Sequence, residues 1–245
     1  MSAASTVTVV SLLPRLLDTN GDAGNARVLA QRARWAGLTA DVVAVHTEQD
    51  LPGRVDLVSI GSGTDTDLIL TRDALAPFAG LISGWLAAGV PVLAVGTGWE
   101  LLSDGVDLPD GTHIDGLGVV AGRAVPLPAR ATDDLVVTGG VERLIGFENH
   151  ARGYRGGAEA LGSVGNSTGT GNGDGTEGTV AGAFIGTHLH GPVLARNPGL
   201  ADRMLHRVAV ARGLDVPSSV RAQGVDDIAL AARNQVATRL GLPTE

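Results

Sequence analysis

The chain has 245 residues, of which 44% are hydrophobic and 18% charged, so it is long enough to bury one sizeable core and is unlike disordered or fibrous proteins. A net charge of −8 without a basic run argues against nucleic-acid binding, and neither a signal peptide nor a run of about 18 apolar residues is present, so we expect a cytoplasmic protein without a membrane span. The absence of cysteine excludes disulfides, thiolate metal sites and a thiol nucleophile.

The first 95 residues alternate between short apolar runs and segments with helical spacing. We predict buried strands at Val7–Pro14, Ala40–His46, Val55–Ile60 and Pro91–Val95. One helix is expected after Gly21-Asp22, with its apolar face formed by Ala26, Leu29, Ala30 and Ala33. A second is expected over Thr64–Ala88, with a break near Pro77. Strands that alternate with helices predict an α/β fold with a largely parallel sheet.

The chain after Asp104 is richer in strand signals, glycine and proline. Short strands are predicted at Gly118–Leu127, Asp134–Val137, Leu144–Phe147 and Thr179–Thr187. Residues Gly162–Gly178 have the composition of a flexible low-complexity loop.

Two helices are predicted at the end of the chain. Asn197-Pro198 is typical of a helix start, with Asn as the cap, and the apolar stripe of this helix is Leu200, Met204, Leu205 and Val208. A last helix, about Val225–Leu240, follows a polar link that contains Pro217. We therefore divide the chain into a domain of residues 1–212 and a C-terminal helical appendage of residues 213–245.

The segment PVLAVGTGWELL combines a buried strand, a tight Gly-x-Gly turn and helix-compatible residues. This is the layout of a nucleophile elbow, in which the central residue is exposed in a strained conformation and the following N–H groups point at an oxyanion. An ordinary strand-to-helix turn of a doubly wound fold has the same pattern, since glycine is common there for steric reasons. The segment alone leaves both interpretations open.

Other motifs give the elbow a context. They are GDAGN at Gly21–Asn25, IGSGTD at Ile60–Asp65, AVGTGWELL at Ala94–Leu102, DGLG at Asp115–Gly118, GFENH at Gly146–His150, GNGDGTEG at Gly171–Gly178 and GTHLHGPVLARNP at Gly186–Pro198. In order and spacing the chain resembles the GatD-type class I glutamine amidotransferases, the glutaminase subunits of lipid II isoglutaminyl synthase, which are related to cobyric acid synthase glutaminase domains. The resemblance implies a flavodoxin-like fold with a more β-rich second half, and it makes the Gly-rich loop a family feature.

The resemblance also implies a reaction and a partner. Glutamine is hydrolysed through a cysteine thioester, and ammonia passes to a Mur-ligase-like partner, MurT, in a heterodimer. That partner uses ATP to activate the D-glutamate α-carboxyl of the lipid II stem peptide for amidation, in cell wall synthesis. We expect glutamine as a possible ligand and no cofactor in the chain itself.

The family's catalytic cysteine falls on Gly96, so the nucleophile is absent. The resemblance assigns an oxyanion N–H to Thr97 and places Ser62 near the second donor of that site. Either hydroxyl is a remote candidate for a replacement nucleophile, and a simple turn role suits Ser62 better. Because loss of the nucleophile can cost about six decades of rate, ordinary glutaminase activity is doubtful.

His190 matches the family's catalytic base, and the resemblance implies that the carboxylate orienting it comes from the partner subunit, since position 192 is Pro. His188 lies two residues earlier, so a histidine metal pair is conceivable, although packing is the simpler role and we expect no metal. Arg130 aligns with the arginine that holds the glutamine substrate, and a surface arginine is the alternative. Asp22, Asn25, Glu148 and Asn149 are interpreted as polar groups that fix loops near the site.

Three hypotheses follow. The chain is a GatD-like subunit that docks on a ligase partner and works with free ammonia or another donor. Alternatively it is a non-catalytic binding, regulatory or scaffold homologue, or a cysteine-containing parent was altered at position 96. A cobyric acid synthase-like glutaminase is a further alternative, although such domains usually belong to longer chains.

Overall fold

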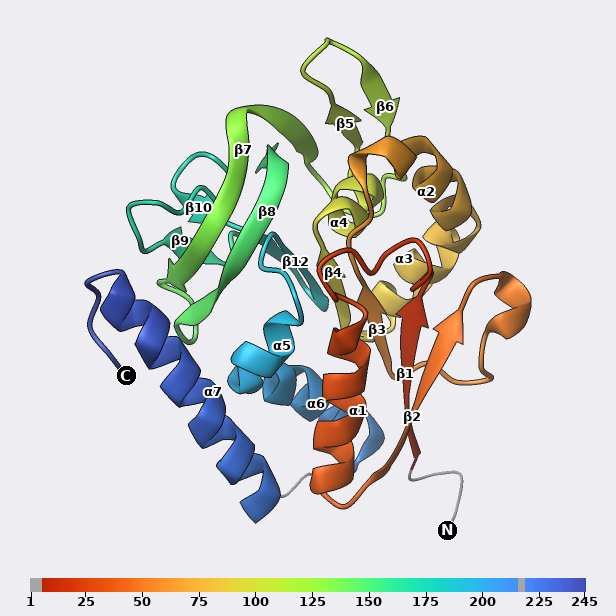
Figure 1. Cartoon of the computed structure of the whole chain (residues 1–245). Helices are drawn as coiled ribbons and strands as arrows, with labels where there is room; N and C mark the ends of the chain where they lie inside the picture. The colour runs from red at the N-terminus through yellow and green to blue at the C-terminus, as the bar shows by residue number, and fades with distance from the viewer. Residues whose placement is uncertain (1–5, 216–218) are drawn as a thin grey trace.

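A computed structural model describes residues 6–215 and 219–245, so residues 1–5 of the N-terminus and Pro217 of the predicted link lie outside the described part. The main sheet has six strands in the order β11-β12-β4-β3-β1-β2 (Figure 1). Its neighbours pair in parallel except β11, which is antiparallel to β12. The bounds are β1 Thr6–Leu12, β2 Thr39–Val45, β3 Leu57–Ile60, β4 Val92–Val95, β11 Thr179–Ala181 and β12 Phe184–Thr187. The predicted α/β fold is confirmed.

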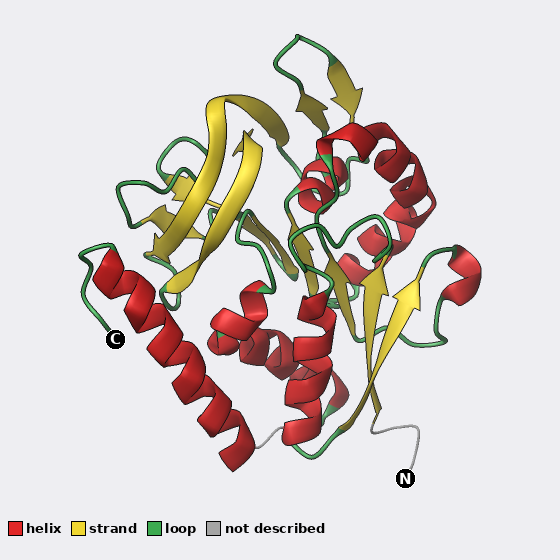
Figure 2. Ribbon diagram, viewed as in Figure 1, coloured by secondary structure: helices red, strands yellow, loops and turns green. Residues whose placement is uncertain are grey.

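Helices cover both faces of this sheet (Figure 2). Strand residues alternate between the faces, so Val7 and Val9 of β1 pack with the first group of helices, whereas Val10 and Leu12 pack with the second. The first group is α1 Gly24–Trp35, α5 Val193–Arg196 and α6 Pro198–Arg212, and the second is α2 Leu68–Leu75, α3 Ala79–Ala87 and α4 Thr97–Leu102. Short 3₁₀ turns are η2 Glu48–Asp50, η3 Asp65–Asp67 and η4 Ala76–Phe78, and η4 contains the predicted break at Pro77.

The second sheet contains β5 Gly105–Asp107, β6 His113–Asp115, β7 Arg123–Thr138, β8 Leu144–Arg155, β9 Gly162–Val164 and β10 Thr176–Glu177. Its order is β10-β9-β7-β5-β6, and β8 pairs with β7. The predicted strands at Asp134–Val137 and Leu144–Phe147 lie within β7 and β8, but the prediction that they are short was wrong. The chain instead forms a long antiparallel pair whose register shifts between Pro126 and Ala131, which accommodates prolines that a regular ladder would exclude.

The predicted face of α6 is confirmed, because its four apolar stripe residues are all buried. The predicted helix start is confirmed, with Asn197 at the N-cap position and Pro198 as the first helical residue, but the Asn197 side chain makes no cap hydrogen bond. Its Oδ1 accepts from the N–H of Ile145 at 2.9 Å, and its Nδ2 donates to the carbonyls of Ile145 and Val193. Asn197 thus completes the edge of β8 rather than the helix end, because a buried strand edge leaves unpaired backbone groups.

The last helix, α7 Val220–Arg239, is longer than predicted and lies along the side of the molecule (Figure 1). Buried Arg32 of α1 donates to Asp202 of α6 and to Asp226 of α7, each at 2.6 Å, and Ala237 packs against Val136 and Ile145. These contacts attach the helix to both halves of the fold.

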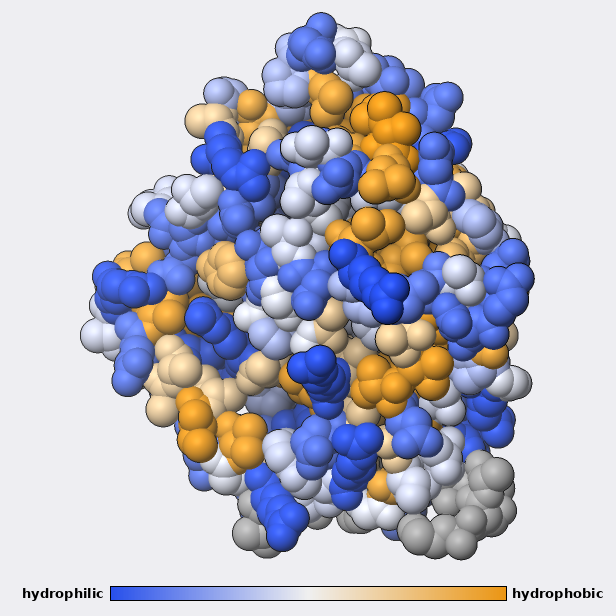
Figure 3. Space-filling view, turned by 45° about the vertical axis from the view of Figure 1, so that its right-hand side comes forward, coloured by the Kyte–Doolittle hydropathy of each residue, from blue (hydrophilic) through white to orange (hydrophobic). Residues whose placement is uncertain are grey.

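The surface is of mixed polarity, with apolar patches separated by polar residues on the face drawn in Figure 3. The large exposed apolar side chains include Ile69 and Leu70 of α2. In the part of the chain that the structure describes, no helix combines the length and hydropathy needed to cross a membrane.

Candidate functional site

Gly96 forms the turn between β4 and α4, at the carboxyl end of the main sheet. Its backbone angles, φ 52° and ψ −126°, lie in a region that side-chain-bearing residues rarely adopt. A Cβ built on Gly96 would lie 2.5 Å from Ser62 Oγ and 2.9 Å from His190 Cε1. The turn therefore has the geometry of a nucleophile elbow, and it faces both of these side chains without carrying a nucleophile.

The predicted site residues line one cavity of about 240 Å³. They come from separate segments: the loop after β3, the turn after β4, the strand β7 and the turn after β12. These residues are Ser62, Gly96, Thr97, Arg130 and His190. The structure thus brings together residues that are up to 128 positions apart in the sequence (190 − 62).

The two N–H groups that an oxyanion site would need donate to hydroxyl groups of the same chain. The N–H of Thr97 donates to Ser62 Oγ at 3.2 Å, and the N–H of Gly63 donates to Thr97 Oγ1 at 2.5 Å. The two hydroxyls also lie 3.2 Å apart. Side chains of the same chain therefore satisfy both donors in this structure, and the oxyanion role of Thr97 stays a prediction.

His190 is buried and pairs with a carboxylate of its own chain. Its Nδ1 lies 2.9 Å from Asp22 Oδ2, and the other oxygen, Oδ1, accepts from the N–H of Gly191 at 2.8 Å. A carboxylate at Nδ1 fixes the proton there, so Nε2 carries the lone pair of a base. The orienting carboxylate comes from Asp22, which corrects the expectation that a partner subunit supplies it.

The GDAGN loop holds the turn that follows β12. Asn25 Oδ1 accepts from the N–H of Leu194 at 3.0 Å, as expected of a loop-fixing residue. Gly191 has a φ of 50°, and a Cβ there would lie 2.3 Å from the carbonyl oxygen of Asn20. The close approach of these two loops, which positions His190 beside Asp22, therefore requires glycine at position 191.

A group of charged residues that also lines this cavity was not singled out from the sequence. Buried Arg152 donates to Glu100 Oε2 at 2.9 Å and to Asp65 Oδ1 at 2.6 Å. Burial alone would raise the pKa of Asp65, but Arg152 and Arg130 hold this pKa below its ordinary value. Burial likewise would lower the pKa of Arg152, and Glu100 and Asp65 raise it.

Arg130 is half-exposed at the rim of the cavity. Its Nε donates to Asn149 Oδ1 at 2.9 Å, and its Nη1 lies 3.3 Å from Asp65 Oδ2. A guanidinium in this place can reach a carboxylate of a bound ligand without breaking a buried ion pair. The substrate-binding role of Arg130 stays a prediction.

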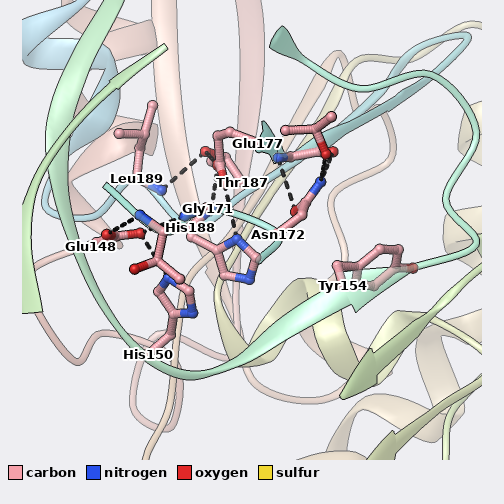
Figure 4. A network of polar contacts seen from close by, with 12 residues as sticks. Glu148, His150, Tyr154, Gly171, Asn172, Glu177, Thr187, His188 and Leu189 are labelled. Atoms are coloured by element: carbon pink, nitrogen blue, oxygen red, sulfur yellow. Dashed lines mark hydrogen bonds and ion pairs between the residues drawn. The ribbon is translucent and has the colours of Figure 1, made fainter. Parts of the chain in front are cut away.

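A second buried network lies beside the cavity (Figure 4). His150 and His188 stack with ring centroids 4.0 Å apart, Glu148 Oε2 is 3.0 Å from His150 Nε2, and Glu177 Oε2 is 3.0 Å from His188 Nδ1. His150 Nδ1 also faces the carbonyl of Arg152 at 2.6 Å, so both ring nitrogens face acceptors, an arrangement that favours the imidazolium form.

The two histidines of this network have opposite pKa shifts. Burial would lower the pKa of His150, but Glu148 and the Arg152 carbonyl raise it. Burial and the charge of His150 lower the pKa of His188. His188 is therefore neutral and donates to Glu177, whose pKa burial would raise but His188 and its other hydrogen-bond donors lower.

The same network holds the Gly-rich loop in place. Glu148 accepts from the N–H groups of Thr170 and Gly171 at 2.7 and 2.9 Å. Glu177 accepts from Thr187 Oγ1 and from the N–H of His188, both at 2.7 Å. Buried charge therefore ties this loop to β8 and to the turn that carries His190, and the composition-based suggestion of a flexible loop is not what the structure shows.

The two histidines of the THLHG segment have different carboxylate partners. His188 Nδ1 faces Glu177, whereas His190 Nδ1 faces Asp22. Within residues 6–215 and 219–245, no group of three or more His, Asp or Glu side chains could hold a metal ion.

Glu148 was expected to fix a loop near the site, and a sequence signal for His150 and Arg152, which were not singled out, lies next to it. Glu148, His150 and Arg152 are polar residues at every second position of β8, and all three are buried. Period-2 spacing places them on one face of the strand, which is unusual for a face that packs inside a protein. Glu100 and Asp65 had no comparable signal, because their roles depend on contacts with distant segments.

A family comparison agrees with this arrangement. The model of the CobB/CobQ-like glutamine amidotransferase domain matches residues 16–198, which is most of the chain. The chain belongs to this family. The match includes the Gly96 turn, the charged wall and the turn of His190, and it ends at the start of α6.

Two relatives carry a more specific name. Subunit GatD of lipid II isoglutaminyl synthase (glutamine-hydrolyzing) from Staphylococcus aureus is 27% identical over 210 residues, which are 85% of this chain and 86% of the relative. The subunit of the same name from Streptococcus pneumoniae is 29% identical over 204 residues, 80% of this chain and 78% of the relative. The predicted resemblance to GatD-type amidotransferases is confirmed.

Solved structures confirm the fold. A glutamine amidotransferase crystal structure superposes with a TM-score of 0.51 at 18% identity, covering 84% of this chain and 99% of the other. A glutamine amidotransferase from Thermotoga maritima gives a TM-score of 0.51 at 16% identity, covering 96% and 94%.

Proposed function

We propose that this chain is the GatD-like subunit of a two-chain ligase that amidates D-glutamate in the lipid II stem peptide, and that it does not hydrolyse glutamine itself. Its relatives of that name span most of its length. One observation supports the loss of hydrolysis: Gly96 occupies the elbow beside His190, and the neighbouring N–H groups are bound to Ser62 and Thr97. A thioester route needs both a nucleophile and a free oxyanion site.

The partner in this proposal is a Mur-ligase-like protein of the MurT type. It would bind ATP and activate the carboxyl group, and because those steps require ATP we also propose a cytoplasmic location. The chain described here would contribute the cavity next to His190 and the surface that docks on the ligase. The nitrogen would come from free ammonia rather than from glutamine.

The test is an amidation assay with the purified chain and its candidate ligase, supplied with lipid II and ATP. We expect amidation with an ammonium salt and no glutamate release when glutamine is the only nitrogen source. Glutamate release at a rate typical of enzymes would refute the loss of hydrolysis. Failure of the chain to bind or stimulate the ligase would refute the subunit role and favour a separate binding function.

A further inference from the structure

Two buried acceptor atoms in the site have no hydrogen-bond donor among the described residues. They are Glu100 Oε1 and His190 Nε2. Both side chains are 1% exposed, and both line the cavity beside Gly96. An unpaired buried polar atom costs about 1–3 kcal/mol, so a pair of them in one cavity indicates a missing ligand.

The hydrogen bonds around these atoms determine the kind of ligand. Asp22 holds the proton of His190 on Nδ1, which leaves only a lone pair at Nε2. Arg152 occupies Glu100 Oε2, which leaves Oε1 as a carboxylate acceptor. Neither atom can donate, so the ligand must supply N–H or O–H groups, and the carboxylate favours a positive charge.

We propose that this cavity binds the ammonium ion. Ammonium carries four N–H donors and one positive charge, so it supplies the donors that Oε1 and Nε2 lack and the charge that a carboxylate favours. The rest of the cavity offers the oxygen atoms of Asp65 and the hydroxyl of Ser62 as further acceptors.

A proton transfer at His190 would turn the bound ion into a usable nucleophile. One N–H bond of ammonium breaks, the proton joins Nε2, and the products are ammonia and an imidazolium whose Nδ1–H remains on Asp22. The imidazolium later returns this proton to solvent. Asp22 compensates the charge that the ring gains, so the pair acts as a base without needing a nucleophile at position 96.

Binding can be tested on the chain alone, by its thermal stability in ammonium chloride against sodium chloride at constant ionic strength, and by the linewidth of ¹⁵N-labelled ammonium in NMR. A ligand of the native state raises the midpoint of unfolding in a saturable way. We expect such a rise with ammonium and none with tetramethylammonium, which has no N–H group. A flat response, or an equal response to both ions, would overturn the proposal.

Two variants locate the site. Glu100→Gln removes the charge of the acceptor, and His190→Ala removes the second acceptor, so each should weaken ammonium binding by about tenfold or more. The matched control is Glu48→Gln, which changes an exposed carboxylate in η2 far from the cavity. If Glu48→Gln weakens binding as much as Glu100→Gln does, the proposed site is wrong.

The binding test is independent of the ligase. The use of bound ammonia for amidation rests on the proposed function, whereas ammonium binding does not. A chain that binds ammonium but supports no amidation would contradict the subunit role and leave the site intact. A chain that supports ammonium-dependent amidation without binding the ion would support the subunit role and contradict the ammonium site.

Discussion

The Ser62 hydroxyl occupies the space that a side chain on Gly96 would need, with Oγ 2.5 Å and Cβ 2.9 Å from the position of a Cβ. Real Cβ atoms do not approach other atoms this closely. The absence of a side chain at Gly96 and the position of Ser62 in the neighbouring loop are therefore complementary.

Restoring a cysteine at position 96 should therefore fail on its own. Gly96→Cys adds backbone strain of about 1–3 kcal/mol and close contacts with Ser62 and His190. Gly96→Cys combined with Ser62→Gly removes the contact with Ser62 and leaves the one with His190 Cε1 at 2.9 Å. Because the chain contains no cysteine, the rate of alkylation by iodoacetamide reports only the new thiol. We expect the double variant to be more stable and to react faster than the single variant.

Gly111→Cys is the matched control for backbone strain. Gly111 has a φ of 87°, and a Cβ there meets nothing within 4 Å. Adding Ser62→Gly should not stabilise this variant. If Ser62→Gly has the same effect with either cysteine, the clash at Gly96 is not what limits the restored thiol.

The pair Asp22–His190 should be important for stability as well as for orientation. Asp22→Asn keeps one acceptor but turns the other oxygen into an NH₂ group, which cannot accept from His190 Nδ1 or must displace the Gly191 contact. We expect a loss of about 1–3 kcal/mol in the free energy of unfolding, measured by urea denaturation. The ¹⁵N shifts of His190 should also report a change of tautomer.

Asp18→Asn tests whether this loss is specific. Asp18 accepts from the N–H of Ala23 in the same loop, but it is exposed. The control should cost much less than Asp22→Asn and leave the His190 tautomer unchanged. Equal losses would show that the loop, and not the pair, carries the effect.

Arg152 should contribute more to stability than its exposed neighbour Arg130. Arg152→Ala leaves the buried Glu100 carboxylate without its cation, and such losses cost about 3–5 kcal/mol. Arg130→Ala breaks a half-exposed pair worth about 0–1 kcal/mol. Urea denaturation of both variants measures the difference.

A double variant checks the cause. Combining Arg152→Ala with Glu100→Gln removes the unpaired charge, so the loss should be smaller than for Arg152→Ala alone. If the two substitutions add without rescue, the cost of Arg152→Ala comes from lost packing rather than from the unpaired buried charge on Glu100.

The sequence predicts the main sheet well because its strands are buried on both faces and read as continuous apolar runs. The same applies to α6, whose stripe repeats with helical period. The long pair β7 and β8 is not predictable in this way, because the buried face of β8 carries the polar residues Glu148, His150 and Arg152. Their burial depends on partners from other segments. Local patterns contain no information on those partners.

In the candidate site, too, some features could be predicted from local patterns and others depend on distant segments. His190 and the Gly96 turn belong to motifs whose spacing is visible in the chain, and the structure brings them together. The roles of Asp22 and Ser62 depend on contacts with residues 168 and 35 positions away, which spacing alone cannot indicate. Asn197 was assigned a local cap for the same reason, although its hydrogen bonds reach Ile145.

The stacked histidines should give the stability of the protein two opposing dependences on pH. The pKa of His188 is lowered by burial and by His150, so the unfolded chain, with an ordinary pKa of about 6.5, binds this proton more readily than the folded chain. The contribution of His188 to stability is then lost as the pH falls below about 6.5.

His150 acts in the opposite direction. Burial would lower its pKa, but Glu148 raises it, so the folded chain keeps a proton that the unfolded chain releases. Its contribution is present in full below a pH of about 6.5 and is lost as the pH rises through the higher pKa of the folded state. The contributions of His188 and His150 to stability therefore change in opposite directions with pH.

Urea denaturation between about pH 5 and pH 8 can separate them, because this range brackets the ordinary histidine pKa. The stability difference between the wild type and His188→Gln should shrink as the pH falls, and the difference between the wild type and His150→Gln should shrink as the pH rises. His46→Gln is the control, since His46 lies outside the network and should leave both profiles unchanged. Profiles with the same sign for both variants would contradict the assignment of a charged His150 stacked on a neutral His188.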